Sequence, residues 1–181
     1  MKIPLSKLKA MILFFGSCTD KRLLGKVKLM KLFYFADFCH LKKYGSPITW
    51  DTYINLEHGP IPSGIKSLVD DAEDLDASKL SDTIKIEKIE NGYLHRIVPM
   101  RNFNESDKKY FSTTEISVMK DVCARFFDKN TKEIEEASHK ESAWKETSFL
   151  DTIPYSTAVK DEDCQISKEE IDLMIKIFNA Y

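Results

Sequence analysis

The sequence contains few cysteines, and their spacing excludes two kinds of structure. Four cysteines stand at positions 18, 39, 123 and 164 of the 181 residues, and no two of them form a C-x-x-C pair. Zinc sites and disulfide frameworks need such regular spacings. We therefore expect free thiols, mostly buried, and no structural metal.

Long apolar runs are missing as well. The N-terminus has an apolar stretch next to lysines, but Met11–Phe15 is too short for the core of a signal peptide and far too short for a membrane-spanning helix. We expect a cytoplasmic protein that does not contact a membrane.

The sequence also lacks the motifs of the common enzyme classes. It has no glycine-rich phosphate loop and no G-x-S-x-G elbow, and none of its four histidines lies in a metal-ligand spacing such as H-E-x-x-H. Cys39 and His40 are neighbours on a predicted helix, where successive side chains point about 100° apart and cannot form a nucleophile–base pair. The sequence thus predicts no enzyme: no catalytic residue, no cofactor and no metal ligand.

Asp37 and His58 keep a catalytic alternative open. Asp37 lies among apolar residues of a predicted core helix, so its carboxylate needs a partner: a lysine, a tyrosine hydroxyl or the turn at residues 58–62. His58 begins that turn, where we expect its ring to hydrogen-bond backbone carbonyls. Catalysis by the two residues would require a concave pocket that joins them.

What the sequence does have is the composition of a globular protein. Hydrophobic residues make up 43% and charged residues 31%, which excludes a disordered or collagen-like chain. A chain of this length can bury one well-formed core. We therefore expect a single domain that spans residues 1–181.

Helical periodicity dominates the chain. Apolar residues recur every three or four positions over residues 4–17, and the helix predicted over residues 25–43 is apolar around most of its circumference. A helix of that kind belongs in the middle of a core. Capping residues open the other predicted helices, which cover residues 64–73 after Ser63, 112–127, 130–139, and the segment from 167 onward.

Two segments favour extended structure. Residues 48–57 are rich in β-branched and aromatic types, and residues 83–89 and 93–98 flank Asn91-Gly92, a strong hairpin signal. Because an isolated hairpin is marginal in water, this one should pack on helices or pair with residues 48–57. The fold predicted is mainly α (α+β): a compact bundle of five to six helices around a central hydrophobic helix, with a small antiparallel β-hairpin or sheet.

Charge is unevenly distributed along the chain. Residues 1–50 carry ten Lys and Arg against two acids, whereas residues 51–90 carry ten acids against four lysines. Either these charges lie on solvated helix faces, or the basic segment, residues 1–50, binds an anionic partner. A nucleic-acid-binding regulator would place seven cations on phosphates: Lys7, Lys9, Lys21, Arg22, Lys26, Lys28 and Lys31. The total charge of only −2 argues against this DNA-binding alternative.

A series of residues points to a family. It comprises Lys28-Leu-Met-Lys-Leu-Phe-Tyr-Phe-Ala-Asp37, His40-Leu-Lys-Lys-Tyr-Gly45, Pro47-Ile-Thr49, Tyr53, His58-Gly-Pro-Ile-Pro-Ser63, Ser138-His-Lys-Glu-Ser-Ala-Trp-Lys145 and Ile153-Pro-Tyr155. This order resembles the Panacea domain of SocA-like antitoxins, which is also found in phage-associated proteins. The likeness spans most of the chain and is most specific in the turn from His58 to Ser63.

The resemblance implies an antitoxin of a toxin–antitoxin system that neutralises a co-encoded toxin by direct protein binding, with no enzyme activity and no cofactor. One member of the family acts as a proteolytic adaptor, so a protease or chaperone is a further partner that the resemblance allows. An acidic run, Asp70, Asp71, Glu73, Asp74 and Asp76, could match a basic toxin.

Ten positions of this chain match the family motif, and they are the candidate partner-binding residues. They are Tyr34, Asp37, Tyr53, His58, Gly59, Pro60, Pro62, Ser63, His139 and Trp144. Either these residues define the shared fold or they contact the toxin, and the sequence leaves both roles open. It also leaves the toxin and the oligomeric state open.

Overall fold

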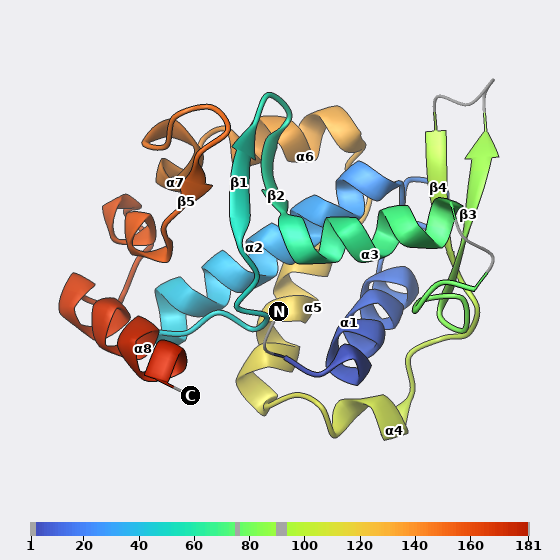
Figure 1. Ribbon diagram of the computed structural model, residues 1–181, viewed down its shortest axis with the longest axis horizontal. Coiled ribbons are helices and arrows are strands. Elements are labelled where there is room, and N and C mark those ends of the chain that lie inside the picture. Colours follow the sequence, from blue (N-terminus) through green and yellow to red (C-terminus); the bar gives the residue numbers. More distant parts are fainter. Residues whose placement is uncertain (1–2, 75–76, 90–93, 181) are drawn as a thin grey trace.

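The computed structural model describes residues 3–74, 77–89 and 94–180 (Figure 1). The helices are α1 Leu5–Cys18, α2 Lys26–Tyr44, α3 Ser63–Asp74, α4 Glu105–Lys108, α5 Thr113–Phe126, α6 Thr131–Ser138, α7 Ser142–Lys145, the 3-10 helix η1 Tyr155–Lys160 and α8 Lys168–Ala180. The strands are β1 Tyr53–Leu56, β2 Gly59–Pro62, β3 Ile84–Ile89, β4 Leu94–Pro99 and β5 Thr152–Ile153.

Helix α2 is the centre of the fold, as predicted. In Figure 1 it runs through the middle of the molecule, with α1 and α5 beside it and the β1–β2 hairpin above it. Fourteen of its nineteen residues are buried. It ends where Gly45 adopts a left-handed conformation (φ 81°) and donates its N–H to the Leu41 carbonyl at 2.8 Å. The mainly α fold class is thereby confirmed.

The helix count exceeds the prediction because three short helices give no periodic signal. Helices α4 and α7 have four residues each and η1 has six. Such segments are shorter than the two turns that a repeating apolar stripe needs. The longer helices begin and end close to their predicted bounds.

Three capping predictions are confirmed and one is wrong. Ser112 and Asn130 form capping boxes with Glu115 and Glu133 at the N-termini of α5 and α6. At the start of α8, Ser167 N donates to the Glu170 carboxylate at 2.9 Å and Glu170 N donates to Ser167 Oγ at 3.3 Å. Helix α3, in contrast, is not capped by Ser63. Asp51 accepts from Gly64 N at 3.0 Å and from Ile65 N at 2.8 Å, so the cap comes from a residue twelve positions before the helix.

The first sheet has the strand order β2-β1-β5 and corrects the predicted turn. Residues 58–62 were expected to form a turn, but Gly59–Pro62 is strand β2, and only Glu57 and His58 turn the chain. Two prolines are tolerated because β2 lies at the edge of its sheet, where one side of the strand needs no donors. Of the predicted extended segment 48–57, only Tyr53–Leu56 is a strand.

The second sheet is the predicted hairpin, strands β3 and β4. Its Asn91-Gly92 turn lies outside the described residues. The hairpin does not pair with residues 48–57; it packs on α1 and α3, and Ile97 N donates to the Leu24 carbonyl at 2.8 Å. Of the two supports expected for it, packing on helices is therefore the one used.

Candidate functional site

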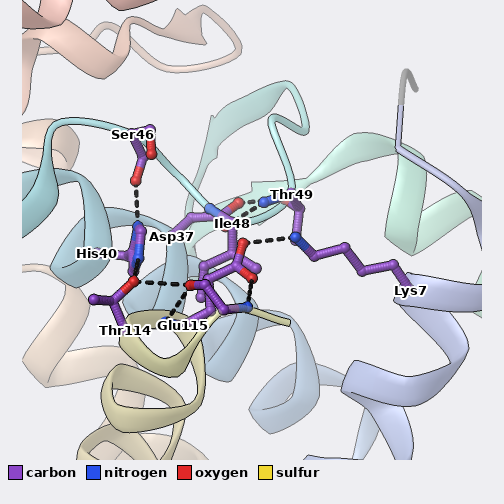
Figure 2. A network of polar contacts seen from close by, with 9 residues as sticks. Lys7, Asp37, His40, Ser46, Ile48, Thr49, Thr114 and Glu115 are labelled. Atoms are coloured by element: carbon purple, nitrogen blue, oxygen red, sulfur yellow. Dashed lines mark hydrogen bonds and ion pairs between the residues drawn. The ribbon is translucent and has the colours of Figure 1, made fainter. Parts of the chain in front are cut away.

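Asp37 is the centre of a buried polar network that joins α2 to the loop after it (Figure 2). Its side chain is fully buried and accepts from Ile48 N at 2.9 Å and Thr49 N at 2.8 Å. It also accepts from the Thr49 hydroxyl and, at 2.9 Å, from the Tyr53 hydroxyl. The predicted need for a partner is confirmed, and of the three candidates the tyrosine hydroxyl is used.

The network continues from Asp37 to the N-terminus of α3. The Thr49 hydroxyl oxygen accepts from Asp51 N at 3.2 Å, and Asp51 caps α3. Tyr155 donates its hydroxyl to the Asp51 carbonyl at 2.8 Å. Burial raises the pKa of Asp37 to about 6, and the hydrogen bonds from Thr49 and Tyr53 hold it from rising further. One buried carboxylate thus positions α2, β1 and α3 together.

His40 fastens the same loop from the other side. Its Nδ1 lies 2.6 Å from the Ser46 carbonyl and its Nε2 lies 3.1 Å from the Thr114 hydroxyl at the start of α5 (Figure 2). Both ring nitrogens of His40 thus have partners other than its neighbour Cys39, and burial raises the pKa of the Cys39 thiol to about 11. The four cysteines are free thiols, as expected, but only Cys123 is fully buried. The two residues do not form a nucleophile–base pair.

Two motif tyrosines pack beside Asp37. The rings of Tyr34 and Tyr53 meet edge to face at 5.7 Å, and both side chains are fully buried. Burial raises the pKa of both hydroxyls well above the usual range. Within the described residues the Tyr34 hydroxyl has no hydrogen-bond partner. These residues support the core and cannot touch a partner.

Gly59 and Lys31 mediate close packing of strand β2 against helices α2 and α6. The buried Lys31 donates to the Pro60 carbonyl at 2.8 Å. Gly59 has φ 90°, and a Cβ on it would lie 2.4 Å from Ser138 Oγ and 3.0 Å from Lys31 Nζ. No residue with a side chain fits there. The motif glycine is therefore explained by close packing.

Lys31 makes folding stability depend on pH. Burial lowers its pKa from 10.5 to about 7, so between these values the native state binds fewer protons than the unfolded state. Stability should therefore rise as pH increases from about 7 to about 10.5, with a slope of up to about 1.4 kcal/mol per pH unit. Lys31→Met should remove this rise in urea unfolding between pH 6 and 9.5, whereas Lys43→Met, at an exposed position of the same helix, should keep it. A rise that persists in Lys31→Met would contradict the assignment.

Three further motif residues, His58, His139 and Trp144, lie at the end of the β1–β2 hairpin. His139 and Trp144 stack at 4.1 Å between ring centroids, and Trp144 Nε1 donates to the Leu56 carbonyl at 3.2 Å. His139 hydrogen-bonds the backbone of Glu57, and burial and the Lys31 charge lower its pKa. His58 does not fasten the turn as expected: its side chain is 71% exposed and faces Glu135 across 3.7 Å.

Two exposed apolar residues that no sequence pattern predicted lie in the loop beside this hairpin end. Phe149 and Leu150 are each 63% exposed. Asn55 holds their loop against β1. Its side-chain Nδ2 donates to the Trp144 and Thr147 carbonyls at 3.2 and 2.6 Å, and its backbone carbonyl accepts from Leu150 N at 2.8 Å. In Figure 1 the β1–β2 turn lies between α6 and the α7–β5 segment. We call His58, His139, Trp144, Phe149 and Leu150 the hairpin-end surface.

Burial divides the ten candidate residues into two groups. Six are buried and serve the fold: Tyr34, Asp37, Tyr53, Gly59, Pro60 and Pro62. Ser63 is exposed at the start of α3, and the other three lie on the hairpin-end surface. Phe149 and Leu150 follow no periodic pattern, so no sequence signal marks them. Lys31 did carry a signal, because it stands in a helix that is apolar nearly all round.

Comparison with protein families decides the family of the chain. A family model described as the antitoxin SocA-like, Panacea domain matches residues 29–145. The chain belongs to this family. No curated protein and no solved structure matches it. The match includes Asp37 with its hydrogen-bond donors, the contact of Gly59 with Lys31 and Ser138, and Trp144, whereas Phe149, Leu150 and Tyr155 lie beyond it.

Six of the seven cations considered for phosphate binding are engaged within the fold of this Panacea protein, whereas Lys21 is exposed. Lys28 and Lys31 are fully buried, and Lys28 Nζ donates to the Phe127 and Lys129 carbonyls. Four of the other cations pair with acids: Lys7 with Glu115, Lys9 with Asp82, Arg22 with Asp20, and Lys26 with Asp70 and Glu73. These pairs also engage part of the acidic run that was expected to meet a basic toxin. Most of the named basic side chains of residues 1–50 are thus paired with acidic side chains of the same chain.

Asp37 and His58, the two residues of the catalytic alternative, lie in different environments of this Panacea protein. Asp37 is buried and bonded to Thr49 and Tyr53, whereas the His58 side chain is 71% exposed, and neither residue lines any of three pockets of 330, 420 and 430 Å³. Within residues 3–74, 77–89 and 94–180, no group of three or more His, Cys, Asp or Glu could hold a metal ion. No helix in that part of the chain is long and apolar enough to cross a membrane.

Proposed function

We propose that this protein is an antitoxin that neutralises a protein toxin by binding it directly through the hairpin-end surface. The observation that carries the proposal is the family match over residues 29–145, since antitoxins act on a protein partner. We further propose that the whole chain is one domain and acts by binding, without catalysis or a cofactor.

The chemistry of the hairpin-end surface supports this role. Protein interfaces take most of their binding energy from a few large side chains, with aromatic residues enriched among them. Phe149 and Leu150 offer such side chains beside the Trp144–His139 stack. Hydrogen bonds from Asn55 and Trp144 hold the loop in place, so little flexibility is lost when a partner binds.

Backbone strain at Leu150 also supports a functional role. Its φ is 71°, a conformation that side-chain-bearing residues rarely adopt and that costs about 1–3 kcal/mol. Strain of this size is not explained by packing, because the side chain is 63% exposed. A strained residue that keeps an apolar side chain in solvent is expected where a partner covers it.

A growth assay tests the function. The gene adjacent to this one is expressed in a bacterial host with and without this protein, followed by co-purification. We expect the neighbour to stop growth, and this protein to restore growth and co-elute with the neighbour. Toxin that disappears on rescue would instead indicate delivery to a protease. A harmless neighbour that does not co-elute would refute the antitoxin proposal.

Two substitutions test the hairpin-end surface itself. Phe149→Ala should weaken toxin binding roughly tenfold to a hundredfold. Leu150→Gly should weaken binding similarly while leaving the midpoint of thermal unfolding unchanged or higher, because glycine relieves the positive φ. Leu173→Ala with Ile177→Ala removes apolar side chains of α8 that are 56% and 45% exposed, and it should leave binding unchanged. Equal effects of both sets, measured by calorimetry, would refute this surface.

A further inference from the structure

Strand β5 leaves one edge of the first sheet open. It is an outer strand in the order β2-β1-β5. Hydrogen-bonded pairs alternate along an antiparallel ladder with pairs whose backbone groups point away from each other. Asn55 N donates to the Asp151 carbonyl at 2.9 Å, so the next pair, Ile54 and Thr152, is of the second kind. The N–H and C=O of Thr152 therefore point away from β1, and neither group has a hydrogen-bond partner among the described residues.

The opposite edge of the sheet cannot accept a strand in the same way. All four residues of β2 are buried, and the strand packs against α2 and α6. Pro60 and Pro62 also lack the N–H that an added strand would need. A strand that joins this sheet must therefore pair with β5.

Thr152 also lines a pocket of 430 Å³. This volume lies in the range of about 300–1,000 Å³ that is typical of ligand sites. Trp50, Tyr155 and Phe178 contribute aromatic rings to the lining, and Ile175 contributes an aliphatic side chain. A large apolar side chain is the group that such a lining accepts. The open edge of β5 and an apolar pocket thus lie side by side.

Backbone strain marks both this pocket and the hairpin-end surface. Among the described residues other than glycine, Trp50 and Leu150 have a positive φ, 55° and 71°. Large side chains rarely adopt this conformation, and residues that do so cluster at sites that bind ligands. Thr49 N–H, bonded to the buried network, and the Asp51 cap of α3 fix the chain on either side of Trp50. Its ring stacks on Phe178 with 4.1 Å between the centroids, so this wall of the pocket is formed before any partner binds.

The pocket and the hairpin-end surface lie along one stretch of chain. Phe149 and Leu150 come directly before Asp151 and Thr152. A strand rises about 3.3 Å per residue, so an extended segment of about five residues spans both surfaces. Asp151 adds a charge between them, because its carboxylate is exposed and has no cationic partner in the described part of the chain. An unpaired carboxylate at this position favours a basic residue in the partner.

We propose that β5 and this pocket bind an extended segment of the toxin. The segment adds to β5 as a strand, and one of its residues exchanges two hydrogen bonds with the backbone of Thr152. A large apolar side chain of the segment enters the pocket, and a basic residue lies near Asp151. In this mode of recognition the backbone hydrogen bonds provide affinity and the pocket provides specificity. The assignment rests on the proposed function, because it names the part of the toxin that the antitoxin recognises.

The two tryptophans of the chain report on the two surfaces separately, because Trp50 lines the pocket and Trp144 lies on the hairpin-end surface. The full chain, labelled with 5-fluorotryptophan, is titrated with the product of the adjacent gene. Fluorine NMR follows one signal from each tryptophan, assigned with Trp50→Phe, and we expect both signals to shift. A complex that shifts Trp144 but not Trp50 would overturn this inference and leave the antitoxin proposal intact. If no complex forms, the proposed function fails and this inference fails with it.

Substitutions test the two parts of the site. Thr152→Pro removes the outward N–H without breaking a hydrogen bond to β1, and it should weaken toxin binding in calorimetry about tenfold or more. Thr152→Val keeps the N–H and should bind at least about tenfold more tightly than Thr152→Pro. Asn179→Trp narrows the pocket from an exposed position of α8 and should also weaken binding, whereas Lys176→Trp, exposed on the same helix outside the pocket, should not. Circular dichroism checks that each variant folds. Wild-type affinity in both Thr152→Pro and Asn179→Trp would overturn the inference.

Discussion

Replacing Asp37 by alanine is expected to lower the free energy of unfolding by about 3–5 kcal/mol, a large share of the stability of a domain. Four donors would lose their acceptor at once: two backbone N–H groups and the hydroxyls of Thr49 and Tyr53. Each buried donor left unpaired costs about 1–3 kcal/mol, although local rearrangement offsets part of the sum. Urea unfolding followed by circular dichroism at pH 7 measures the loss.

Two milder variants separate the contributions of charge and hydrogen bonding. Asp37→Asn keeps an acceptor for the backbone N–H groups and should lose less than Asp37→Ala. Tyr53→Phe removes one donor and leaves three, so it should cost about 1 kcal/mol. A loss below about 1 kcal/mol in Asp37→Ala would show that the loop after α2 is held by other contacts.

The pH dependence gives an independent test of Asp37. Its pKa is raised from 3.8 to about 6, so between these values the native state binds more protons than the unfolded state. The part of the stability that depends on protonation of Asp37 is therefore greatest below about pH 4 and is lost as pH rises through about 6. This decrease should be absent in Asp37→Asn.

The helices were predictable because their signals are local. The apolar circumference of residues 25–43 indicated a central helix, and the capping boxes at Ser112 and Asn130 marked two N-termini within a few residues. These patterns depend on the helical repeat and on backbone groups nearby in sequence. The hairpin of β3 and β4 was predictable for the same reason.

The features that escaped prediction depend on residues far apart in the chain. Asp51 caps α3 across twelve residues, and β2 forms a strand because β1 pairs with it. The burial of Lys31 depends on a carbonyl of β2. The sequence allowed Lys31 as a phosphate contact in the nucleic-acid alternative, since a lysine in an apolar helix looks the same whether its head group reaches solvent or a buried carbonyl.

The candidate site was predictable in part, through the family resemblance. Three of the ten motif positions, His58, His139 and Trp144, belong to the hairpin-end surface, whereas the six buried positions support the fold. Phe149 and Leu150 could not be found this way, because their exposure follows from the path of an irregular loop and a positive φ. The buried motif residues that specify the fold therefore lie next to the proposed partner-binding residues, but the two sets differ.

Replacing Gly59 by alanine is expected to lower the free energy of unfolding by about 3 kcal/mol or more. Two effects add at this position. The φ of 90° strains any residue with a Cβ, and the new methyl group would lie 2.4 Å from Ser138 Oγ and 3.0 Å from Lys31 Nζ. Relief would require β2 to move away from α6, which also breaks the hydrogen bond from Lys31 to Pro60. Thermal and urea unfolding measure the loss.

A matched glycine separates strain from steric clash. Gly45 has a similar φ of 81°, but a Cβ there would meet Ile166 Cγ2 at an ordinary 3.8 Å. Gly45→Ala should therefore cost only about 1 kcal/mol, the strain alone. Ser138→Ala removes the closest atom, so Gly59→Ala should cost less by about 1 kcal/mol in that background. Equal losses at Gly45 and Gly59, with no coupling to Ser138, would show that the motif glycine serves backbone conformation alone and that the contact between β2 and α6 is loose.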